Sequence, residues 1–299
     1  MDRLDSMRTF VAVAEAEGFA EAARRLRIAP STVSRAVAAL EEELGITLLS
    51  RTTRVVRLTE RGAIYLERCR RILEDVEAAD RLVRGESAEP RGRLTITAPV
   101  CFGRLAVLPV VEQLLRAHPA LSVRLTLLDR VVDLVQEGMD VGVRIGPLPD
   151  STLLATKVGL TRRVVVASPS YLESAGSLES PADLGRHRVI VFESIEATRD
   201  WRFGAEQATS ARVEGTLVVN NVDSAIAAAE AGLGVTRVLC YQAKEAIAAG
   251  RLVLALESYA TPPMPVNLVR PPHRGESPEV GAFVTAAKAY FRDHPVGLE

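Results

Sequence analysis

The feature that most constrains the fold is the stretch of residues 22–41, which reads as two short helices joined by a tight turn. Ala22 and Ala23 give the first helix a small apolar face, so a second helix can cross it closely. Pro30 suits the first turn of that second helix, and Ser31 sits where a hydroxyl can cap free backbone N–H groups. The pattern predicts a helix-turn-helix.

The second helix of this pair has two distinct faces. Apolar residues recur at helical spacing and should point inward, namely Val33, Val37, Leu40 and Leu44. Small, hydroxyl and arginine side chains are left on the outward face, together with the start of the helix: Pro30, Ser31, Thr32, Ser34, Arg35 and Ala38. Such a face suits the major groove of DNA, and we expect these residues, Ala38 apart, to contact DNA. The alternative is an ordinary helical hairpin with a solvated face.

The flanking residues favour DNA binding. Upstream, residues 4–14 form an amphipathic pattern that can cover the helix pair and that ends near Gly18. Downstream, residues 46–49 and 55–58 look like two short strands. The tip between these strands carries Arg51, Thr52, Thr53 and Arg54. A basic tip is suited to phosphates or the minor groove, so residues 1–59 are predicted to form a winged helix-turn-helix DNA-binding domain.

The same residues resemble the DNA-binding domain of the LysR-type transcriptional regulators. The shared motifs follow one another in order: Pro30-Ser31-Thr32-Val33-Ser34-Arg35, Leu40-Glu41, Leu44-Gly45, Arg51-Thr52-Thr53-Arg54 and Leu58-Thr59-Glu60-Arg61-Gly62. The resemblance implies a regulator that binds double-stranded DNA, with RNA polymerase as a further candidate partner. The net charge is only −1, so affinity for DNA must come from a local patch.

A long helix is expected to follow, running from Thr59, a plausible N-cap, to about residue 84. Its apolar residues step by four and three, as in a coiled coil: Tyr65, Cys69, Ile72, Val76, Ala79 and Val83. We expect this seam to join two chains, because two heads can read the half-sites of a pseudo-palindromic operator. The resemblance implies a homodimer or a tetramer. The alternative is a helix docked on its own chain. Residues 60–91 are interpreted as this linker helix and a hinge.

Residues 92–299 alternate between strands and helices, which predicts parallel sheets flanked by helices. The first set includes a helix at about 105–116 and a short helix at 131–137. Two sets predict two α/β lobes, lobe I at about 92–161 and 267–299 and lobe II at about 162–266. This half resembles the effector-binding domain of the same family, which is similar to the periplasmic solute-binding proteins.

A small-molecule effector is expected in the cleft between the lobes, because ligands of such sheets sit outside the carboxyl ends of strands. Candidate effector-binding residues come from strand-end loops: Val100, Cys101, Phe102, Gly146, Pro147, Trp201, Phe203 and Asn221. Many relatives carry Ser or Thr near residues 100 and 101, which helps to hold a carboxylate. The residues here are poor donors, so we expect a more apolar effector. The alternative is that these side chains only pack the lobes together.

Other classes of function fit less well. Three widely spaced cysteines and scattered histidines argue against disulfides and metal sites, and neither a cofactor nor an enzymatic motif is found. One alternative is a thiol-based redox sensor that uses Cys101, with Cys240 as a second candidate in the same cleft; the other is that both cysteines are small buried residues. A solute-binding protein without a DNA role is disfavoured because residues 1–5 do not read as a signal peptide. We expect a cytoplasmic protein without a membrane span.

Overall fold

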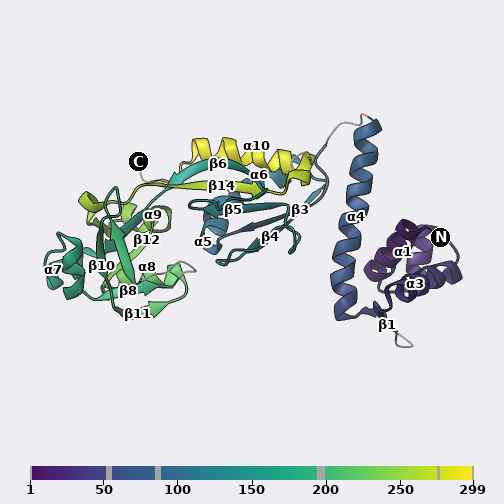
Figure 1. Ribbon diagram of the computed structural model, residues 1–299, viewed down its shortest axis with the longest axis horizontal. Coiled ribbons are helices and arrows are strands. Elements are labelled where there is room, and N and C mark those ends of the chain that lie inside the picture. Colours follow the sequence, from purple (N-terminus) through teal and green to yellow (C-terminus); the bar gives the residue numbers. More distant parts are fainter. Residues whose placement is uncertain (1, 52–55, 85–88, 194–198, 275–276, 298–299) are drawn as a thin grey trace. The chain divides into compact units, whose positions relative to one another are not determined.

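The computed structural model describes residues 2–51, 56–84, 89–193, 199–274 and 277–297, and the chain divides between residues 88 and 89 into two units (Figure 1). The first unit is a helical head with a long linker helix, and the second unit is a two-lobed α/β domain. None of the helices within the described residues is long and apolar enough to cross a membrane.

Three helices build the head: α1 (Arg3–Ala16), α2 (Phe19–Leu26) and α3 (Pro30–Leu44). Their apolar faces meet in one core that includes Met7, Phe10, Val13, Ala22, Ala23, Val33, Val37 and Leu40. Between α2 and α3 the chain turns at Arg27, whose φ of 55° is left-handed. The predicted helix-turn-helix is therefore confirmed. Pro30 occupies the first turn of α3 as expected.

Ser31 does not cap α3, and that part of the sequence interpretation was wrong. Ala29 holds the N-cap position without a side-chain hydrogen bond, so Ser31 is already helical and its side chain is exposed. The helix starts earlier than expected because Pro30 takes the first helical position, where its missing N–H costs nothing. Ser31 is thereby left free of a structural role at the helix start.

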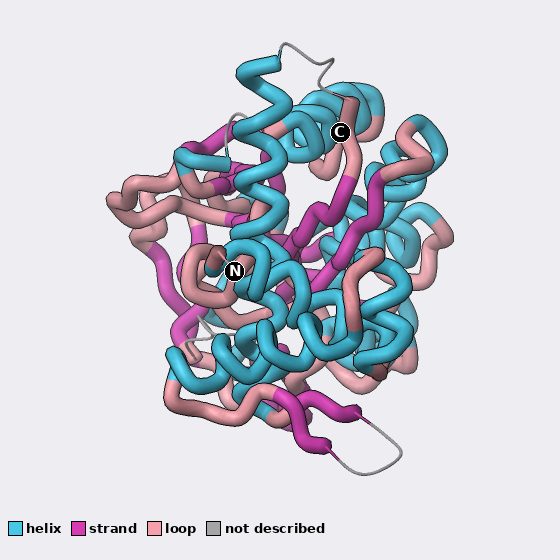
Figure 2. The backbone as a smooth tube through the Cα atoms, turned by 90° about the vertical axis from the view of Figure 1, so that its right-hand side faces the viewer, coloured by secondary structure: helices cyan, strands magenta, loops and turns pink. Residues whose placement is uncertain are grey.

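The two strands of the wing are β1 (Leu49–Arg51) and β2 (Val56–Leu58), which pair antiparallel and run side by side away from the head (Figure 2). The strand expected at residues 46–49 instead begins at Leu49. A side chain of α3 explains the shift, because Glu41 Oε1 accepts the backbone N–H groups of Leu48 at 2.7 Å and Leu49 at 3.0 Å.

Helix α4 (Glu60–Arg84) confirms the predicted linker helix. The hydroxyl of Thr59 accepts the N–H of Gly62 at 2.9 Å and so caps the helix start, as expected. Leu66 and Leu73 are buried in the core of the head together with Cys69 of the predicted seam. The first half of α4 therefore packs on its own head.

Lobe I contains a five-stranded mixed sheet. Its strands, in spatial order, are β4 (Leu121–Leu127), β3 (Gly92–Ala98), β5 (Val141–Ile145), β14 (Met264–Arg270) and β6 (Leu154–Thr161). The first three are parallel, and β14 runs antiparallel to β5 and β6. Its helical segments are α5 (Val100–Phe102), a π-helical turn (Gly103–Val107), α6 (Leu108–Ala117) and α10 (Pro278–Asp293).

Lobe II repeats this plan. Its sheet, in spatial order, contains β11 (Gly215–Val219), β8 (Val189–Phe192), β12 (Val235–Leu239), β7 (Arg163–Ala167) and β13 (Val253–Ala255). The accompanying helices are α7 (Pro169–Ala175), α8 (Val222–Glu230) and α9 (Cys240–Ala248), and a separate hairpin is formed by β9 (Asp200–Phe203) and β10 (Thr209–Arg212). The predicted two-lobed α/β architecture is confirmed.

Three local predictions in this unit need correction. The helix expected at 131–137 is a turn, because Asp133 Oδ1 accepts the N–H groups of Val135 and Gln136 at 2.9 and 3.0 Å. The helix expected from residue 105 begins at Val100, five residues earlier. Residues 264–266 belong to the sheet of lobe I, since β14 starts at Met264.

A glycine at the junction of wing and linker helix generates a testable prediction. A Cβ on Gly62 would lie 2.0 Å from the carbonyl oxygen of Leu48, which is backbone and cannot swing away. Gly62→Ala should therefore destabilise the head by ~1–3 kcal/mol, measured as a lower midpoint of urea unfolding. The matched control is Gly281→Ala in α10, where a Cβ meets no atom within 4 Å and the midpoint should be equal or higher. Equal midpoints for Gly62→Ala and the unaltered chain would contradict this packing.

Candidate functional site

The start of α3 presents a continuous exposed face. Ser31, Arg35 and Ala38 are exposed at helical spacing, while Thr32 and Ser34 are half-buried beside them. Arg35 Nε donates a hydrogen bond to the carbonyl oxygen of Ser31 at 3.4 Å, which lays the side chain along the helix. The face is small apart from this arginine, so another surface can approach the helix closely.

The charges along α3 are asymmetric. No acidic residue lies in its first turn, and its acidic residues are gathered in the last turns as Glu41, Glu42 and Glu43. The N-terminal end of α3, where the exposed face lies, is the positive end of the helix dipole, and this favours the approach of a polyanion. Of the wing residues expected to contact DNA, Thr52, Thr53 and Arg54 and the side chain of Arg51 lie outside the described residues.

A cavity of about 240 Å³ lies in the second unit, between the two lobes. Lobe I lines it with the start of α5, the loop after β4 and the end of β5. Lobe II lines it with the start of β7, the ends of β8 and β12, the hairpin strand β9 and the starts of α8 and α9. Carboxyl ends of parallel strands thus face the cavity, as ligand sites of such sheets require.

The eight predicted effector-binding residues divide into two groups. Val100, Cys101, Trp201 and Asn221 line the cavity. The remaining four do not, namely Phe102, Gly146, Pro147 and Phe203. Because α5 starts at Val100, its third residue is turned into the core, where Phe102 packs edge-on against Tyr241 with ring centres 5.1 Å apart. Ile145, the last residue of β5, lines the cavity in place of the glycine and proline that follow it.

The start of α5 is already occupied by a carboxylate of the chain. Asp129 Oδ1 accepts the N–H of Val100 at 3.0 Å, so the expected attraction of this helix end for an anion is largely satisfied. A second carboxylate, Asp223 at the start of α8, also lines the cavity and pairs with Arg104 at 2.9 Å. This ion pair joins lobe II to lobe I beside the cavity.

Neither cysteine expected near the cleft has the environment of a reactive thiol. Cys101 is buried, and this burial, with a smaller contribution from the charge of Asp223, raises the pKa of its thiol to about 11. Cys240 is also buried, with Sγ 3.3 Å from the hydroxyl of Thr161, and it does not line the cavity. The expectation that Cys240 shares the cleft is therefore wrong.

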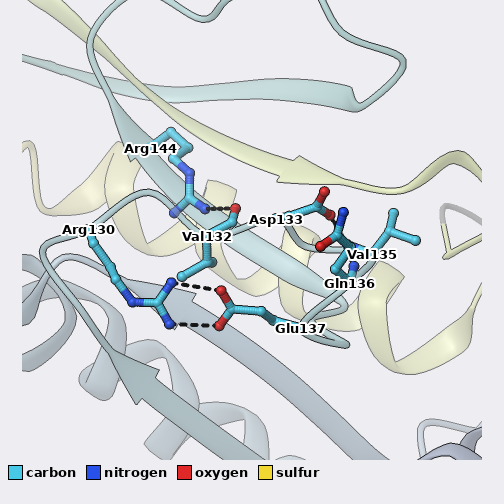
Figure 3. A network of polar contacts seen from close by, with 7 residues as sticks. All are labelled: Arg130, Val132, Asp133, Val135, Gln136, Glu137 and Arg144. Carbon is cyan, nitrogen blue, oxygen red and sulfur yellow. Dashed lines mark hydrogen bonds and ion pairs between the residues drawn. The ribbon is translucent and has the colours of Figure 1, made fainter.

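Four arginines that line the cavity were not among the residues predicted to bind the effector. Arg144, at the end of β5, donates to the carbonyl oxygen of Val132 at 3.1 Å (Figure 3). It also donates to the carbonyl oxygen of Val143 at 3.1 Å. Burial lowers the pKa of Arg144. Beside it, Arg130 forms a two-pronged ion pair with Glu137 at 2.7 and 3.0 Å (Figure 3). Arg130 also lines the cavity.

Two further arginines come from lobe II. The guanidinium of Arg237 lies 4.9 Å from the ring centre of Trp201 and donates to the carbonyl oxygen of Arg202 at 3.2 Å. Arg163 lines the same cavity from the neighbouring strand. Both stand in otherwise apolar strand sequences, Arg163-Val-Val-Val-Ala and Val-Thr-Arg237-Val-Leu. A charged residue in such a strand is the sequence signal that could have identified them.

Comparison with known proteins agrees with this architecture. Residues 4–63 match the bacterial regulatory helix-turn-helix family of LysR type, and residues 87–292 match the LysR substrate-binding domain. The regulator YhjC of Escherichia coli K12 is 34% identical over 95% of this chain and 96% of its own length. The transcriptional activator AaeR of the same strain is 33% identical over 89% of this chain and 86% of its own length.

A solved structure covers both units. CrgA, a LysR-type regulator of Neisseria meningitidis, is 27% identical and has a TM-score of 0.62, with 96% of this chain and 98% of that chain covered. The match extends over the helical head, the linker helix and both lobes. It therefore includes the parts of the chain that form the exposed α3 face and the cavity. The chain belongs to the LysR family of transcriptional regulators, which combine a DNA-binding helix-turn-helix with a substrate-binding domain.

Proposed function

We propose that this regulator reads the bases of its operator through the outward face of α3. The observation that carries the proposal is the exposure of Ser31 and Arg35 at the positive end of a helix whose acidic residues lie at the other end. Arginine hydrogen-bonds guanine edges through two nitrogens, and a serine hydroxyl adapts to any base. Pro30, Thr32 and Ser34 complete the face, and the wing residues 51–54 are proposed to contact phosphates.

The cavity between the lobes is proposed to hold the effector. Its lining residues come from both lobes, so a molecule that fills it contacts both and shifts the equilibrium between lobe arrangements. We propose that this shift changes the spacing of paired heads on DNA, within the cytoplasm. A solute-binding role alone leaves the exposed face of α3 without a use, and the relatives are regulators and not enzymes.

Replacement of Arg35 tests the reading face. Arg35→Ala should reduce the preference of the full-length protein for its promoter fragment over unrelated DNA, by ~1–3 kcal/mol or about 5- to 150-fold, because one base-edge contact is lost. Competition gel shifts at fixed salt measure this ratio. The matched control is Arg24→Ala on α2, an exposed arginine that pairs with Glu21. An unchanged preference in Arg35→Ala would show that another surface reads the sequence.

The second half of α4 is proposed to pair two chains into a homodimer, and the assembly is either this dimer or a tetramer made of two such dimers. Tyr65 and Cys69 of the predicted seam belong to the core of the head, with the Tyr65 ring centre 5.8 Å from that of Phe10. Farther along the seam, Ile72 is 40% and Val83 88% exposed. Exposed apolar side chains at coiled-coil spacing support the proposal that a partner helix packs there. The proposed seam is therefore shorter than the one expected from the sequence.

A charge on this seam tests pairing. Ile72→Glu combined with Val83→Glu should convert the dimer to a monomer in sedimentation velocity, because two like charges would face each other across the interface. Ala63→Glu is the control, since residue 63 is exposed on the opposite side of α4. Persistence of the wild-type assembly in the double variant would contradict a role for this seam.

The redox-sensor alternative makes a different prediction. With its pKa raised to about 11, Cys101 is protonated at pH 7–8, and its contribution to thiolate reactivity appears only as the pH approaches 11. The native protein should therefore react slowly with a thiol reagent such as dithionitrobenzoate at pH 8, and rapidly after denaturation. Peroxide should change DNA binding equally in the native protein and in Cys101→Ser. A fast native reaction that Cys101→Ser abolishes would revive the redox function.

A further inference from the structure

We propose that the effector is a small organic acid whose carboxylate binds between Arg163 and Arg237 on lobe II. This inference rests on the proposed effector role of the cavity and adds the chemical class and the orientation of the ligand. It also reverses the expectation of an apolar effector, because that expectation considered only the residues at the start of α5.

The two arginines are neighbours on one face of a sheet. β7 and β12 pair antiparallel, with Val165 opposite Arg237 and Arg163 opposite Leu239. Residues two positions apart on a strand share a face, so Arg163 and Arg237 form a diagonal pair on the same face. Both line the cavity. Two guanidinium groups at this spacing offer several N–H donors to one planar anion.

Arg237 carries a charge that is not neutralised within the described part of the chain. Its hydrogen-bond partner there is the carbonyl oxygen of Arg202, and its other contacts are the faces of Trp201 and Phe203. Burial, with the nearby charge of Arg163 as a second cause, lowers the pKa of Arg237 to about 9, so it is still a cation at neutral pH. Arg237 is half-buried, and a partly desolvated cation without a counter-charge is costly, so an anionic ligand relieves that cost.

The start of α5, on the lobe I side of the cavity, is flanked by two carboxylates, while Arg144 lines the cavity from β5. Asp129 caps the start of α5 and Asp223 pairs with Arg104, and both carboxylates line the cavity near Cys101. A ligand carboxylate is repelled there, although the start of α5 is a helix N-terminus. The carboxylate is therefore directed to the strands of lobe II, and any hydrogen-bond donor of the ligand is directed to the two aspartates.

The rest of the cavity sets the size and polarity of the ligand body. A volume of about 240 Å³ is just below the range of about 300–1,000 Å³ that is usual for ligand pockets, which favours a small metabolite over a nucleotide or a peptide. The lining also includes apolar side chains from both lobes, namely Val143, Ile145, Phe192, Leu239 and Met264. We therefore infer a carboxylate attached to a compact apolar body.

Matched acids and amides test the charge preference directly. Benzoate, 3-phenylpropionate and hexanoate, each compared with its carboxamide, are titrated into the full-length protein by calorimetry at pH 7.5. At least one acid should bind ten times more tightly than its amide, and Arg237→Met should abolish that difference. Arg212→Met, at an exposed arginine of the same lobe, is the control and should retain it. No acid preferred over its amide, or a preference that survives Arg237→Met, would overturn the proposal.

Stability of the ligand-free protein gives a second readout. If the role of Arg237 is to bind an anion, the Arg237→Met variant should melt at the same or a higher temperature. The substitution removes a half-buried charge and keeps an unbranched apolar side chain in its place. A marked fall in melting temperature, with the acid preference unchanged, would show that Arg237 has a structural role only.

The two proposals fail in distinguishable ways. Acids that bind through Arg237 without any effect on operator gel shifts would support the anion site and contradict effector control. Acids and amides that alter operator binding equally would support effector control and contradict the anion site.

Discussion

Two side chains of the head hold α3, the wing and the linker helix in a fixed arrangement. The carboxylate of Glu41 accepts the N–H groups of Leu48 and Leu49, which attaches the wing to α3. The hydroxyl of Thr59 donates to the carbonyl oxygen of Thr47 at 2.8 Å and caps α4, which attaches the linker helix to the same segment. Helix α3, the wing and the linker helix therefore meet at residues 47–49. A groove-binding domain needs such fixed relations, because misplacement of one element loses the contacts of the others.

In the second unit the corresponding constraint is the path of the chain between the lobes. The chain leaves lobe I between β6 and β7 and returns to it with β14, so two crossings join the sheets. The cavity lies between these sheets, and the pair of Arg104 with Asp223 also spans it. The lobes are also joined by packing, because one apolar cluster contains buried side chains of both sheets, among them Ile96 of β3 and Val166 of β7.

Most of the fold could be predicted from the sequence, because ordered motifs specify the head and alternating strands and helices specify the two lobes. The failures have physical causes. The start of β1 depended on Glu41, eight residues away in the chain and adjacent only in the fold. The helix expected at 131–137 does not form, because the carboxylate of Asp133 accepts the backbone N–H of Val135 and stabilises a turn. The arginines of the cavity were missed because their strands have the apolar composition of buried strands. In addition, the face of a sheet that borders a cavity is decided by how the two lobes pack, which the local sequence does not reveal.

The burial of Leu66, Cys69 and Leu73 in the head has a mechanical consequence. The first half of α4 cannot move without carrying α3 with it, so the head and this half of the helix act as a stiff lever. At about 1.5 Å per residue the 25 residues of α4 extend over about 37 Å. If α4 rotates by a few degrees about its C-terminal end, α3 is displaced by ångströms. That displacement is comparable to the tolerance of a hydrogen bond to a base edge.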